Sequence, residues 1–508
     1  MKKEIVIVGG GTAGWMTSLY LKKIYRNEAN ISLIESDKIG ILGAGEGTIP
    51  IFISTLTQLG IDFNDFVNKT NATYKVGINF ENWNGDCKNY YHAFGVTNGK
   101  YSPYSFDDGN PYNTQIGNEY IGYLVKNNLS LNDCISSNVL LQNDKSPFLK
   151  NENNFELSNY YALHFDASLA AKYFRKLAEK RGVKRIEGLV SRFSQNESGN
   201  ITHIHLKGGV KIKTNFVFDC TGFKRLIIGE LYKTEWKSYE DYLTVNSTIP
   251  FFLPATKDIK PYTRAIAMKY GWMWMSPLQN RQGCGYIFDD RYINEEEAQK
   301  EVEDFLGHPI KINRKIKFKA GSFKKVWVNN CIAIGLSTGF TEPLEATSIW
   351  IAITQLDMLN KNEINNPTQK IIDSYNDKFC EMNDDILNFI QFHYFTKRKD
   401  TEFWKYYNNN QPMQSSLKSM TNTWKTNCPT FEDFNNLNYF KTNFFSWHSY
   451  IYIGMGLEYF DKDLFIKSYE NFDKKDMMES HHKNNMNSIK KIVENSYNVN
   501  DAIKNIKL

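Results

Sequence analysis

Three glycines near the start of the chain have the spacing that brings a backbone turn against a diphosphate. Ile5 to Val8 is a short run of β-forming apolar residues; Gly9-x-Gly11-x-x-Gly14 follows, and Trp15 to Ile24 has helical spacing. Such a strand, turn and helix gives a tight turn, close approach of the backbone to a ligand, and free N–H groups at the helix start. A second apolar run, Ile31 to Ile34, ends in Glu35, about 20 residues past the last glycine, where such folds carry the carboxylate that binds ribose hydroxyls. The pattern predicts an adenine dinucleotide site, for FAD or NAD.

One further glycine-containing stretch bears on the choice between these cofactors, and another lies in the loop after the second strand. The stretch from Phe216 to Phe223, FVFDCTGF, is predicted to be a buried strand that ends in Thr221-Gly222, and the loop from 41 to 50 carries Gly43, Gly45 and Gly47. Glycines let the backbone approach a flat ligand closely. Because segments far apart in the sequence converge on one cofactor, the pattern favours FAD over NAD.

An amine and a carboxylate are the next candidates for chemistry. Lys75 lies in a mostly alternating stretch from Thr73 to Trp83, which is typical of a strand, and the pattern alone makes it a solvated charge on a sheet. Glu345 follows a buried strand that is expected to end at Gly335, and a helix is expected to start near Pro343. A carboxylate in the first turn is favoured by the helix dipole, so the pattern alone allows Glu345 to be an ordinary helix-start acid.

Composition excludes several classes of protein. The chain has 508 residues, 41% of them hydrophobic, a mean hydropathy of −0.49, and no apolar run near the length of a membrane span. A net charge of +5 is too small for this length to indicate nucleic acid binding. The seven cysteines are scattered without a CxxC pair, which is typical of reduced thiols and argues against a metal site. Because the chain runs directly into a strand with no signal peptide, we expect a cytoplasmic enzyme.

The order of the patterns predicts an α/β fold built around a parallel sheet. We expect residues 1–83 and 156–360 to form an FAD-binding domain. The polar, aromatic segment 84–155 reads as an insertion that covers a site, and 361–508 is expected to be mainly helical, with one long amphipathic helix from Ile372 to Phe389. Trp272 and Trp274 alternate in GWMWMSP, a pattern that core packing also explains.

Taken together, these motifs resemble the flavin-dependent halogenases, the family of the tryptophan halogenases, over most of the chain. The resemblance rests on GGGTAG, GAGEGTIP, TYKVG, FDCTGF, GWMWMSP, GCGYIF and GLSTGFTEPLEATS. The Trp-x-Trp stretch usually ends in Ile-Pro, and here Ser276 replaces the isoleucine. In related monooxygenases the later flavin loop carries Gly-Asp, whereas this chain has Gly335-Leu336, as halogenases do.

The resemblance implies a GR2-type, Rossmann-like flavoprotein monooxygenase fold with a mainly helical substrate-covering region (84–155 and 361–508). It implies that reduced FAD from a separate reductase, oxygen and a halide ion yield hypohalous acid. Lys75 would hold this oxidant or become a haloamine, and Glu345 would stabilise the cationic aromatic adduct and aid its deprotonation. The halide would rest near Thr347 and Ser348, where the family usually has glycine in place of Ser348, and His92 and Phe94 would line the substrate ring. The implied cofactor-binding residues are Gly9, Gly11, Thr12, Ala13, Gly14, Glu35, Gly45, Gly47, Thr48, Thr221, Gly222, Gly335 and Gly339.

The substrate expected from this comparison is an electron-rich aromatic of the indole or phenol type. Tryptophan halogenases grip the amino acid's backbone groups with a tyrosine pair and a glutamate, which have no secure match in the stretch from Phe445 to Tyr459. Two alternatives stay open: an aromatic hydroxylase on the same fold, and a flavin-binding relative without catalysis. No membrane or nucleic acid partner is expected, and a homodimer is left open.

Overall fold

The computed structural model describes residues 2–40, 46–94, 114–150, 161–409, 411–434, 437–440 and 443–505. The chain divides into two compact units, each assembled from three segments. Unit 1 comprises residues 1–72, 165–246 and 317–383; unit 2 comprises residues 73–164, 247–316 and 384–508. The division groups 73–83 and 247–316 with the C-terminal helices, whereas the sequence assigned them to the cofactor-binding part, and the domain roles stay a prediction.

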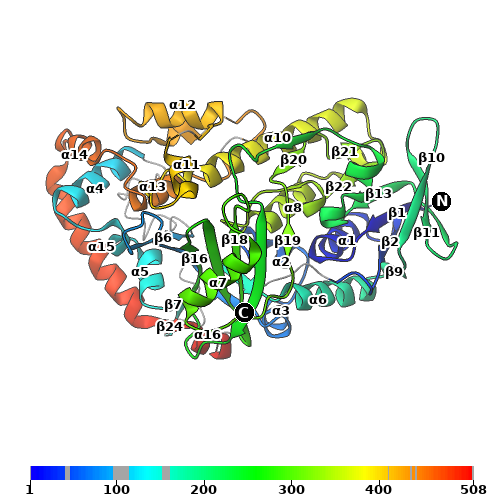
Figure 1. The fold of residues 1–508 in the computed structure, drawn as a ribbon, viewed down its shortest axis with the longest axis horizontal. Helices are drawn as coiled ribbons and strands as arrows, with labels where there is room; N and C mark the ends of the chain where they lie inside the picture. Colours follow the sequence, from blue (N-terminus) through cyan, green and yellow to red (C-terminus); the bar gives the residue numbers. More distant parts are fainter. Residues whose placement is uncertain are drawn as a thin grey trace. The chain divides into compact units, whose positions relative to one another are not determined.

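Unit 1 is built around a six-stranded sheet with the order β21-β22-β13-β1-β2-β9. Five neighbouring strands run parallel and only β21 is antiparallel. The strands are β1 (Lys3–Val8), β2 (Ala29–Glu35), β9 (Lys184–Glu187), β13 (Phe216–Asp219), β21 (Trp327–Val328) and β22 (Cys331–Ala333). The predicted parallel sheet is therefore present (Figure 1), with its apolar strands buried as such sheets require.

Two smaller sheets and a set of helices complete this unit. The sheets are β10 (Val190–Gln195), β11 (Ile201–Leu206) and β12 (Lys211–Lys213), and β14 (Trp236–Ser238), β20 (Gly321–Phe323) and β23 (Gly339–Phe340). The helices are α1 (Thr12–Tyr25), α2 (Ile51–Gln58), α3 (Phe63–Lys69), α6 (Ala167–Lys180), α8 (Thr347–Asp357) and α9 (Lys361–Asn365). Short helical turns are η2 (Gly222–Lys224), the π-type η3 (Leu226–Leu231) and η4 (Gly335–Ser337).

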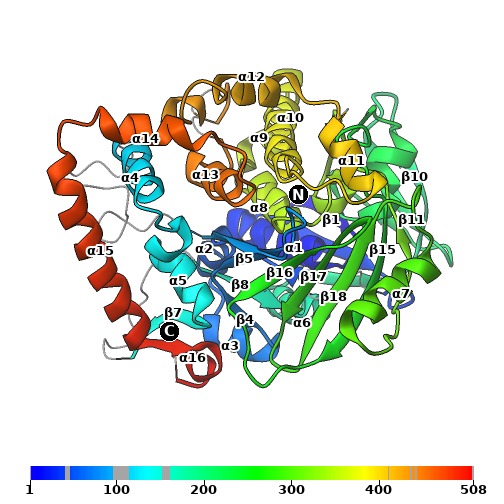
Figure 2. The same cartoon turned by 60° about the vertical axis from the view of Figure 1, so that its left-hand side comes forward.

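Unit 2 contains a mostly antiparallel sheet with the consecutive strands β15-β18-β17-β16-β5-β6, in which only β16 and β5 run parallel. These strands are β5 (Gly77–Glu81), β6 (Asn89–Ala93), β15 (Ser247–Pro254), β16 (Tyr262–Ala267), β17 (Gly271–Pro277) and β18 (Arg281–Phe288). Helix α7 (Glu295–Leu306) packs Ala298 and Val302 into the apolar core of this sheet (Figure 2). The remaining strands are β4 (Thr73–Lys75), β7 (Lys145–Leu149), β8 (Ala162–Phe165) and β24 (Ser496–Asn498); β19 (Ile316–Lys317) lies at the boundary of the units.

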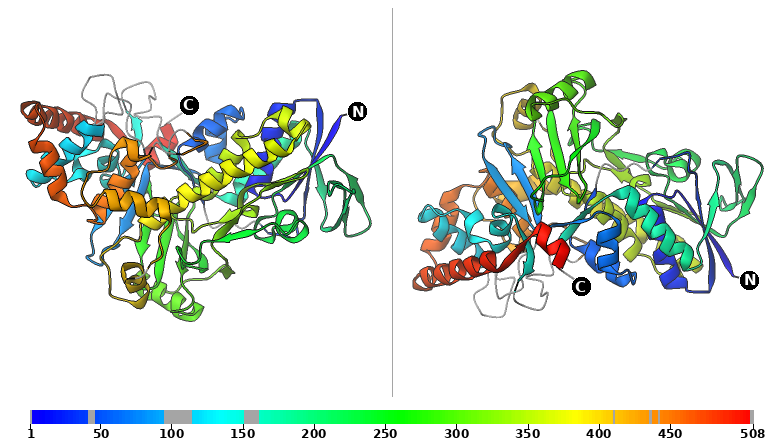
Figure 3. Two further views of the ribbon diagram at one scale, coloured as in Figure 1. Left: turned by 90° about the horizontal axis from the view of Figure 1, so that it is seen from above. Right: turned by 90° about the horizontal axis from the view of Figure 1, so that it is seen from below.

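The helices of unit 2 come from the insertion and from the C-terminal segment. They are α4 (Thr114–Lys126), η1 (Leu131–Cys134), α5 (Ser136–Gln142), α11 (Glu402–Asn409), α12 (Ser415–Thr423), η5 (Phe431–Phe434), α13 (Trp447–Gly456), α14 (Lys462–Glu470), α15 (Lys475–Asn495) and α16 (Val499–Asn505). Helix α4 lies beside the orange to red helices α14 and α15 (Figure 3), where Tyr120, Leu124 and Met478 share a core. Helix α10 (Gln369–Phe392) is the long predicted helix.

Two local predictions were wrong in detail. The stretch from Thr73 to Trp83 forms two strands, β4 and β5, because the Val76 N–H leaves the first pairing and donates to the Pro261 carbonyl at 2.6 Å. The helix expected near Pro343 begins at Thr347, because the two residues before it adopt positive φ. Glu345 is therefore outside the helix rather than in its first turn.

Candidate active site

The turn between β1 and α1 in unit 1 requires its glycines. Gly9 has a φ of +112°, and a Cβ there would lie 2.2 Å from the carbonyl oxygen of Cys220 on the neighbouring strand end. A Cβ on Gly14 would lie 1.9 Å from the Gly9 carbonyl oxygen, so the helix packs directly on the turn. A Cβ on Gly11, by contrast, would meet no heavy atom within 4 Å. The backbone at Gly11 is thus open to a ligand while Gly9 and Gly14 shape the turn.

Thr12 provides a test of whether this turn fits a diphosphate. It is the first residue of α1, only 9% exposed, and its Oγ1 has no hydrogen-bond partner among the described residues. A buried hydroxyl normally has a partner, and the preceding Gly11 gives the helix no side-chain cap. A phosphate at this helix start would accept from the hydroxyl and from the free backbone N–H groups. The residues present therefore fit the predicted group, with Ala13 next in the same turn.

Glu35 lies at the end of β2, at the same edge of the sheet as this turn. Its carboxylate accepts from Trp15 Nε1 at 3.2 Å, from Arg175 Nη1 at 3.2 Å and from Arg185 Nε at 2.6 Å. A Cβ on Gly10 would collide with its Oε2. Glu35 is thus fixed against the glycine turn, and its role in binding ribose stays a prediction.

Asp219 organises the second glycine segment. Its fully buried carboxylate accepts from the N–H and hydroxyl of Thr221, at 3.1 and 2.7 Å, and from the N–H groups of Ile227 and Ile228, at 2.9 and 3.0 Å. These bonds hold Thr221-Gly222 in place directly after β13, next to the end of β1. The sequence analysis did not assign Asp219 a role, although its place in FDCTG was the available signal.

The third segment, at Gly335, meets the first two. Gly335 has a φ of +67°, and a Cβ there would lie 3.1 Å from the Ala13 Cβ. The Gly222 N–H donates to Ser337 Oγ at 2.9 Å, which ties the second segment to the third. Three predicted segments, separated by more than a hundred residues each, therefore converge on the start of α1.

The other predicted cofactor-binding residues have less direct geometry. A Cβ on Gly339 would lie 2.5 Å from the Gly321 carbonyl oxygen, so this glycine lets β23 pair closely with β20. Gly47 ends the short strand β3 (Glu46–Gly47) and Thr48 is fully buried. Gly45 lies outside the described residues.

The segment before α8 is conformationally unusual. Glu345 and Ala346 both have positive φ, +56° and +55°, and neither is glycine. Left-handed conformation costs such residues about 1–2 kcal/mol each, and strain of this kind is concentrated at functional sites. Glu345 is 1% exposed. Thr347, which follows Ala346, is equally buried, and its Oγ1 has no hydrogen-bond partner among the described residues. This helix start therefore suits an anion, which would accept from the hydroxyl and from backbone N–H groups. Ser348 follows and is partly buried.

Lys75 lies in unit 2 and is buried. It is 1% exposed on β4, and its Nζ lies 5.0 Å from the centre of the Phe94 ring. A desolvated ammonium over a ring face is a cation–π geometry. The pattern-based interpretation of Lys75 as a solvated charge is therefore wrong, and the structure brings two of the predicted site residues, Lys75 and Phe94, together.

A hydrogen-bonded chain of side chains fixes the strand that carries Lys75. The Thr73 hydroxyl donates to the Pro277 carbonyl at 2.6 Å, and it lies 3.3 Å from His164 Nδ1. Since the hydroxyl has one hydrogen, it accepts from Nδ1–H, and Nε2 of the neutral ring accepts from the Thr263 hydroxyl at 2.9 Å. Burial, and secondarily the charge of Lys75, holds the pKa of His164 well below its usual range, so the ring stays neutral.

This chain joins β4 to three other strands of unit 2. Thr73 and His164 are opposite each other in the β4–β8 pair, Thr263 is on β16, and Pro277 ends β17. Residues two apart on a strand share a face, so Lys75 projects from the same face of β4 as Thr73 and its hydrogen-bonded partners. Sequence reasoning missed Thr73, His164 and Thr263, because only pairing across the strands brings them together.

The alternating tryptophans of β17 occupy one face of their sheet. Met273 and Met275 point into the core with Cys284 and Tyr286, so Trp272 and Trp274 project from the other face, with ring centres 6.2 Å apart. A Cβ on Gly285 would lie within 2.1 Å of the Trp274 ring, so this glycine makes room for it. The tryptophans are thus set apart from the sheet's own core.

His92 lies in an aromatic cluster of unit 2. Its ring centre is 5.5 Å from that of Phe389, 6.4 Å from Phe445 and 6.2 Å from Tyr452, and the side chain is 4% exposed. These rings come from β6, the end of α10, and α13 with the residues before it. The crowding of aromatic residues between 438 and 460 was the signal for this cluster, but the partners of His92 could not be identified from it.

Unit 1 thus has the organisation of an FAD-binding flavoprotein, in which three glycine segments meet at the end of a parallel sheet, and unit 2 holds a buried lysine beside aromatic rings. The family model for tryptophan halogenases matches residues 4–465. The chain belongs to this family of flavin-dependent halogenases.

Individual relatives agree with this assignment. Tryptophan 7-halogenase RebH from Lentzea aerocolonigenes is 33% identical over 430 residues, covering 79% of this chain and 78% of its own. The structure of Xcc4156, a flavin-dependent halogenase from Xanthomonas campestris, superposes with a TM-score of 0.88 at 27% identity, covering 99% and 98% of the two chains. That of BrvH, a flavin-dependent halogenase from Brevundimonas sp. BAL3, gives 0.86 at 26% identity, covering 99% of each. In the described part of the chain, every helix is too short or too polar to span a membrane.

Proposed function

We propose that this flavin-dependent halogenase acts on a small electron-rich aromatic compound of the indole or phenol type that lacks an amino acid group. The observation that carries the proposal is the burial of Lys75 at 1% exposure beside Phe94, in the unit that also holds the His92 aromatic cluster. A buried amine next to aromatic rings suits the transfer of an oxidising halogen to an aromatic substrate.

The dinucleotide is held by unit 1 in this proposal. The start of α1, with Gly11 and the Thr12 hydroxyl, binds the diphosphate, and Glu35 binds the ribose. Thr221-Gly222 and Gly335 approach from the adjacent strand ends, with the other predicted glycines and Thr48 completing the set. Bound reduced FAD, delivered by a separate reductase, supplies with oxygen the oxidising equivalents that turn halide into hypohalous acid.

The halide rests at the start of α8. The backbone N–H groups of Thr347 and Ser348 and the Thr347 hydroxyl are donors, and the helix dipole favours an anion there. Bromide should serve at least as well as chloride, since it is easier to oxidise.

Lys75 and Glu345 act on the oxidant and on the adduct respectively. The amine of Lys75 holds hypohalous acid by hydrogen bonding or takes its halogen as a haloamine. The carboxylate of Glu345 stabilises the cationic adduct that forms when the ring attacks the halogen, and then accepts the ring proton. His92 and Phe94 line the ring, and the β17 tryptophans screen flavin from substrate.

The stretch from Phe445 to Tyr459 supports a substrate without an amino acid group. Its single glutamate, Glu458, is 46% exposed and pairs with Lys397 at 3.3 Å. Tyr450 and Tyr452 in the same stretch are buried at 0% and 5% exposure. A glutamate that is ion-paired at the surface is not placed to grip the ammonium of a bound amino acid together with those tyrosines.

The test combines two active-site variants with a substrate panel. Lys75→Ala should retain FAD binding and the formation of trappable hypohalous acid, while halogenated product disappears. Glu345→Gln keeps the shape and removes the charge, and should lower the halogenation rate on the order of 10²-fold. Lys88→Ala, at a lysine with 75% exposure, is the matched control and should behave as wild type.

Product is measured by mass spectrometry with reductase, FAD, NADH and each halide, on indole, phenol and free tryptophan. A Lys75→Ala enzyme that halogenates at the wild-type rate would contradict the role of the amine. Efficient chlorination of free tryptophan at a single position would contradict the substrate class, while leaving the halogenase assignment intact.

A further inference from the structure

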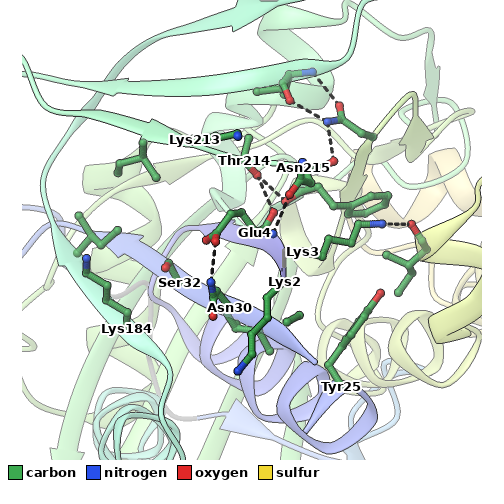
Figure 4. A pocket seen from close by; sticks show the side chains of 18 of the residues that line it. Lys2, Lys3, Glu4, Tyr25, Asn30, Ser32, Lys184, Lys213, Thr214 and Asn215 are labelled. Carbon is green, nitrogen blue, oxygen red and sulfur yellow. Dashed lines mark hydrogen bonds between the residues drawn. The ribbon is translucent and has the colours of Figure 1, made fainter. Parts of the chain in front are cut away.

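A large groove lies in unit 1 at the edge of the parallel sheet where its strands begin. Its volume is about 1880 Å³, and the first residues of β1, β2, β9 and β13 line it together with β12 and the end of α9 (Figure 4). The glycine turn follows Val8 at the other end of β1, roughly 16 Å away for six residues of strand. All of β9 lines the groove, however, and Arg185 Nε on this strand donates to Glu35 at 2.6 Å, so one end of the groove adjoins a residue of the predicted dinucleotide site.

The groove concentrates the positive charge of the chain. Its lining includes eight lysines and arginines and three glutamates, a net charge of five. The formal net charge of the whole chain is also +5. Outside this groove the charges of the chain balance, so the excess is a local property of the groove and not a general one of the surface.

The three glutamates are already engaged. Glu4 accepts from Asn30 Nδ2 at 2.6 Å, as Figure 4 shows. Glu187 pairs with Arg185 at 2.5 Å, and Glu28 pairs with Lys361 at 2.6 Å. Glu28 and Glu187 therefore have cationic partners, whereas the charge of Glu4 is paired only with a neutral amide and offsets part of the excess of the other cations.

Four lysines of the groove have no ion pair or hydrogen bond from their ammonium groups to any described residue. They come from three different segments, and they are Lys2, Lys184, Lys211 and Lys213. Figure 4 shows Lys2, Lys184 and Lys213 around the Glu4–Asn30 pair. Lys3, by contrast, points away and donates to the Ile364 carbonyl at 2.5 Å.

The effect of this charge is visible on neighbouring side chains of β11. Burial and then the charges of Lys211 and Lys213 lower the pKa of His203 below its usual value; burial, then Arg192, then Lys211 lower the pKa of His205. A surface that carries an excess of one sign of charge can steer a partner of the opposite sign.

The volume of the groove and the residues that line it indicate which class of partner it binds. Small-molecule pockets measure about 300–1,000 Å³, so this groove is larger than a small ligand needs. Single-stranded nucleic acid stacks its bases on exposed aromatic rings, but the two rings of this lining, Tyr25 and Phe216, are buried at 2% and 1% exposure. An acidic segment of protein fits the charge without needing such rings.

The backbone of the groove also suits an extended segment. Strand β9 is the last strand of the six-stranded sheet and β12 is the last of the β10-β11-β12 sheet, so each lines the groove as an edge strand within the described sheets. Edge strands carry N–H and C=O groups that can pair with an added chain.

We propose that this groove docks an extended acidic segment of another protein, with Lys2, Lys184, Lys211 and Lys213 contacting its carboxylates. The segment lies along the starts of β1, β2 and β13, opposite the end of β1 that leads into the glycine turn.

The test uses the full-length protein and a fluorescein-labelled oligoglutamate peptide, with binding followed by fluorescence anisotropy. Wild type should bind it with an affinity that falls as salt rises. The variant Lys184→Glu/Lys211→Glu/Lys213→Glu should lose affinity by about tenfold or more. Lys418→Glu/Lys490→Glu/Lys491→Glu changes three exposed lysines elsewhere and alters net charge equally, and it should change affinity by less than about twofold.

Each other result overturns the proposal. Equal losses in the two triple variants would mean that net charge alone attracts the peptide. Tighter groove-dependent binding of inorganic tripolyphosphate or of a single-stranded oligonucleotide would assign the groove to those anions instead. If wild type does not bind the peptide at low salt, the lysines serve only to protect edge strands from pairing. Circular dichroism and halogenation supplied with chemically reduced FAD should be unchanged in both triple variants, which separates this result from failure of the enzyme.

Discussion

Replacing Thr73 by valine tests whether the hydrogen bonds of Thr73 and His164 hold strand β4, which carries Lys75, in place. Valine keeps the branched shape and strand preference of threonine but removes the hydroxyl that donates to Pro277 at 2.6 Å and lies 3.3 Å from His164 Nδ1. The variant leaves two buried polar groups without their partner, the Pro277 carbonyl and the His164 N–H. Each such group costs about 1–3 kcal/mol, and the longer of the two contacts belongs at the low end. We expect Thr73→Val to lose about 2–4 kcal/mol of unfolding free energy.

The consequence for activity follows from the position of Lys75 two residues further along β4. A strand released from Pro277 lets the amine move relative to Phe94, and a displacement of about 1 Å is enough to cost on the order of 10²-fold in a positioned reaction. Halogenated product should therefore fall while the amount of trappable hypohalous acid does not. Urea unfolding and the ratio of product to trapped oxidant are the two measurements.

Two further variants separate positioning from general loss of stability. Thr263→Val removes only the donor to His164 Nε2, so it should cost about 1–2 kcal/mol and have a smaller effect on product. In His164→Asn the amide can replace Nδ1–H toward Thr73, so it should retain more product than His164→Gln, whose amide reaches toward Thr263. Thr73→Val with wild-type stability and wild-type product yield would refute the reasoning, as would equal yields from His164→Asn and His164→Gln.

Two more predictions address backbone strain and a buried acid. Ala346 has a φ of +55°. Ala346→Val should lower the free energy of unfolding by about 1–2 kcal/mol because a branched side chain disfavours the left-handed region, whereas Ala346→Gly should stay within about 1 kcal/mol of wild type. Urea unfolding of both variants measures this, and a valine variant as stable as the glycine variant would contradict the left-handed conformation. Burial raises the pKa of Glu119 from 4.5 to about 7, so the folded state binds the proton more tightly and stability falls as pH rises from about 4.5 to 7. Glu119→Gln removes this loss, and its thermal midpoint should exceed that of wild type at pH 8 by more than at pH 5; a difference independent of pH would be evidence against the buried ionisation.

The cofactor-binding part of the fold was accessible from sequence because its constraints are local. A run such as Ile5 to Val8 with glycines directly after it specifies a strand, a turn and a helix without any distant information. The end of α1 was accordingly predicted to within one residue, at Ile24 against the observed Tyr25, although the helix begins at Thr12 and not at Trp15. Ser337 was not predictable in the same way, since nothing near residue 337 indicates that its hydroxyl accepts from Gly222, more than a hundred positions away.

Lys75 shows where pattern reasoning stops. An alternating strand places charged residues on the solvent side by default, and only the resemblance to the halogenases singled this lysine out. Its burial depends on tertiary packing, and the partners of its strand, His164 and Thr263, are about 90 and 190 residues further along the chain. The apolar–polar alternation of a strand describes that strand alone. Whether both of its faces are buried depends on the other elements that pack on them.

Glu345 was placed in the wrong local structure for a related reason. Pro343 followed by an acid is a typical helix start, and the helical preference of the next residues gives no sign of two left-handed residues in succession. Sequence statistics favour the unstrained conformation, but the fold keeps Glu345 and Ala346 at positive φ and starts α8 after them. A helix begun at Pro343 would direct the Glu345 side chain along the helix surface, in register with the turns that follow. The strained pair instead uncouples the direction of the carboxylate from the axis of α8, so the same short segment can present an acid from its turn and free N–H groups from its helix start. In the proposed mechanism this separation matters, because a halide at the helix start and a carboxylate on the same helix face would repel each other.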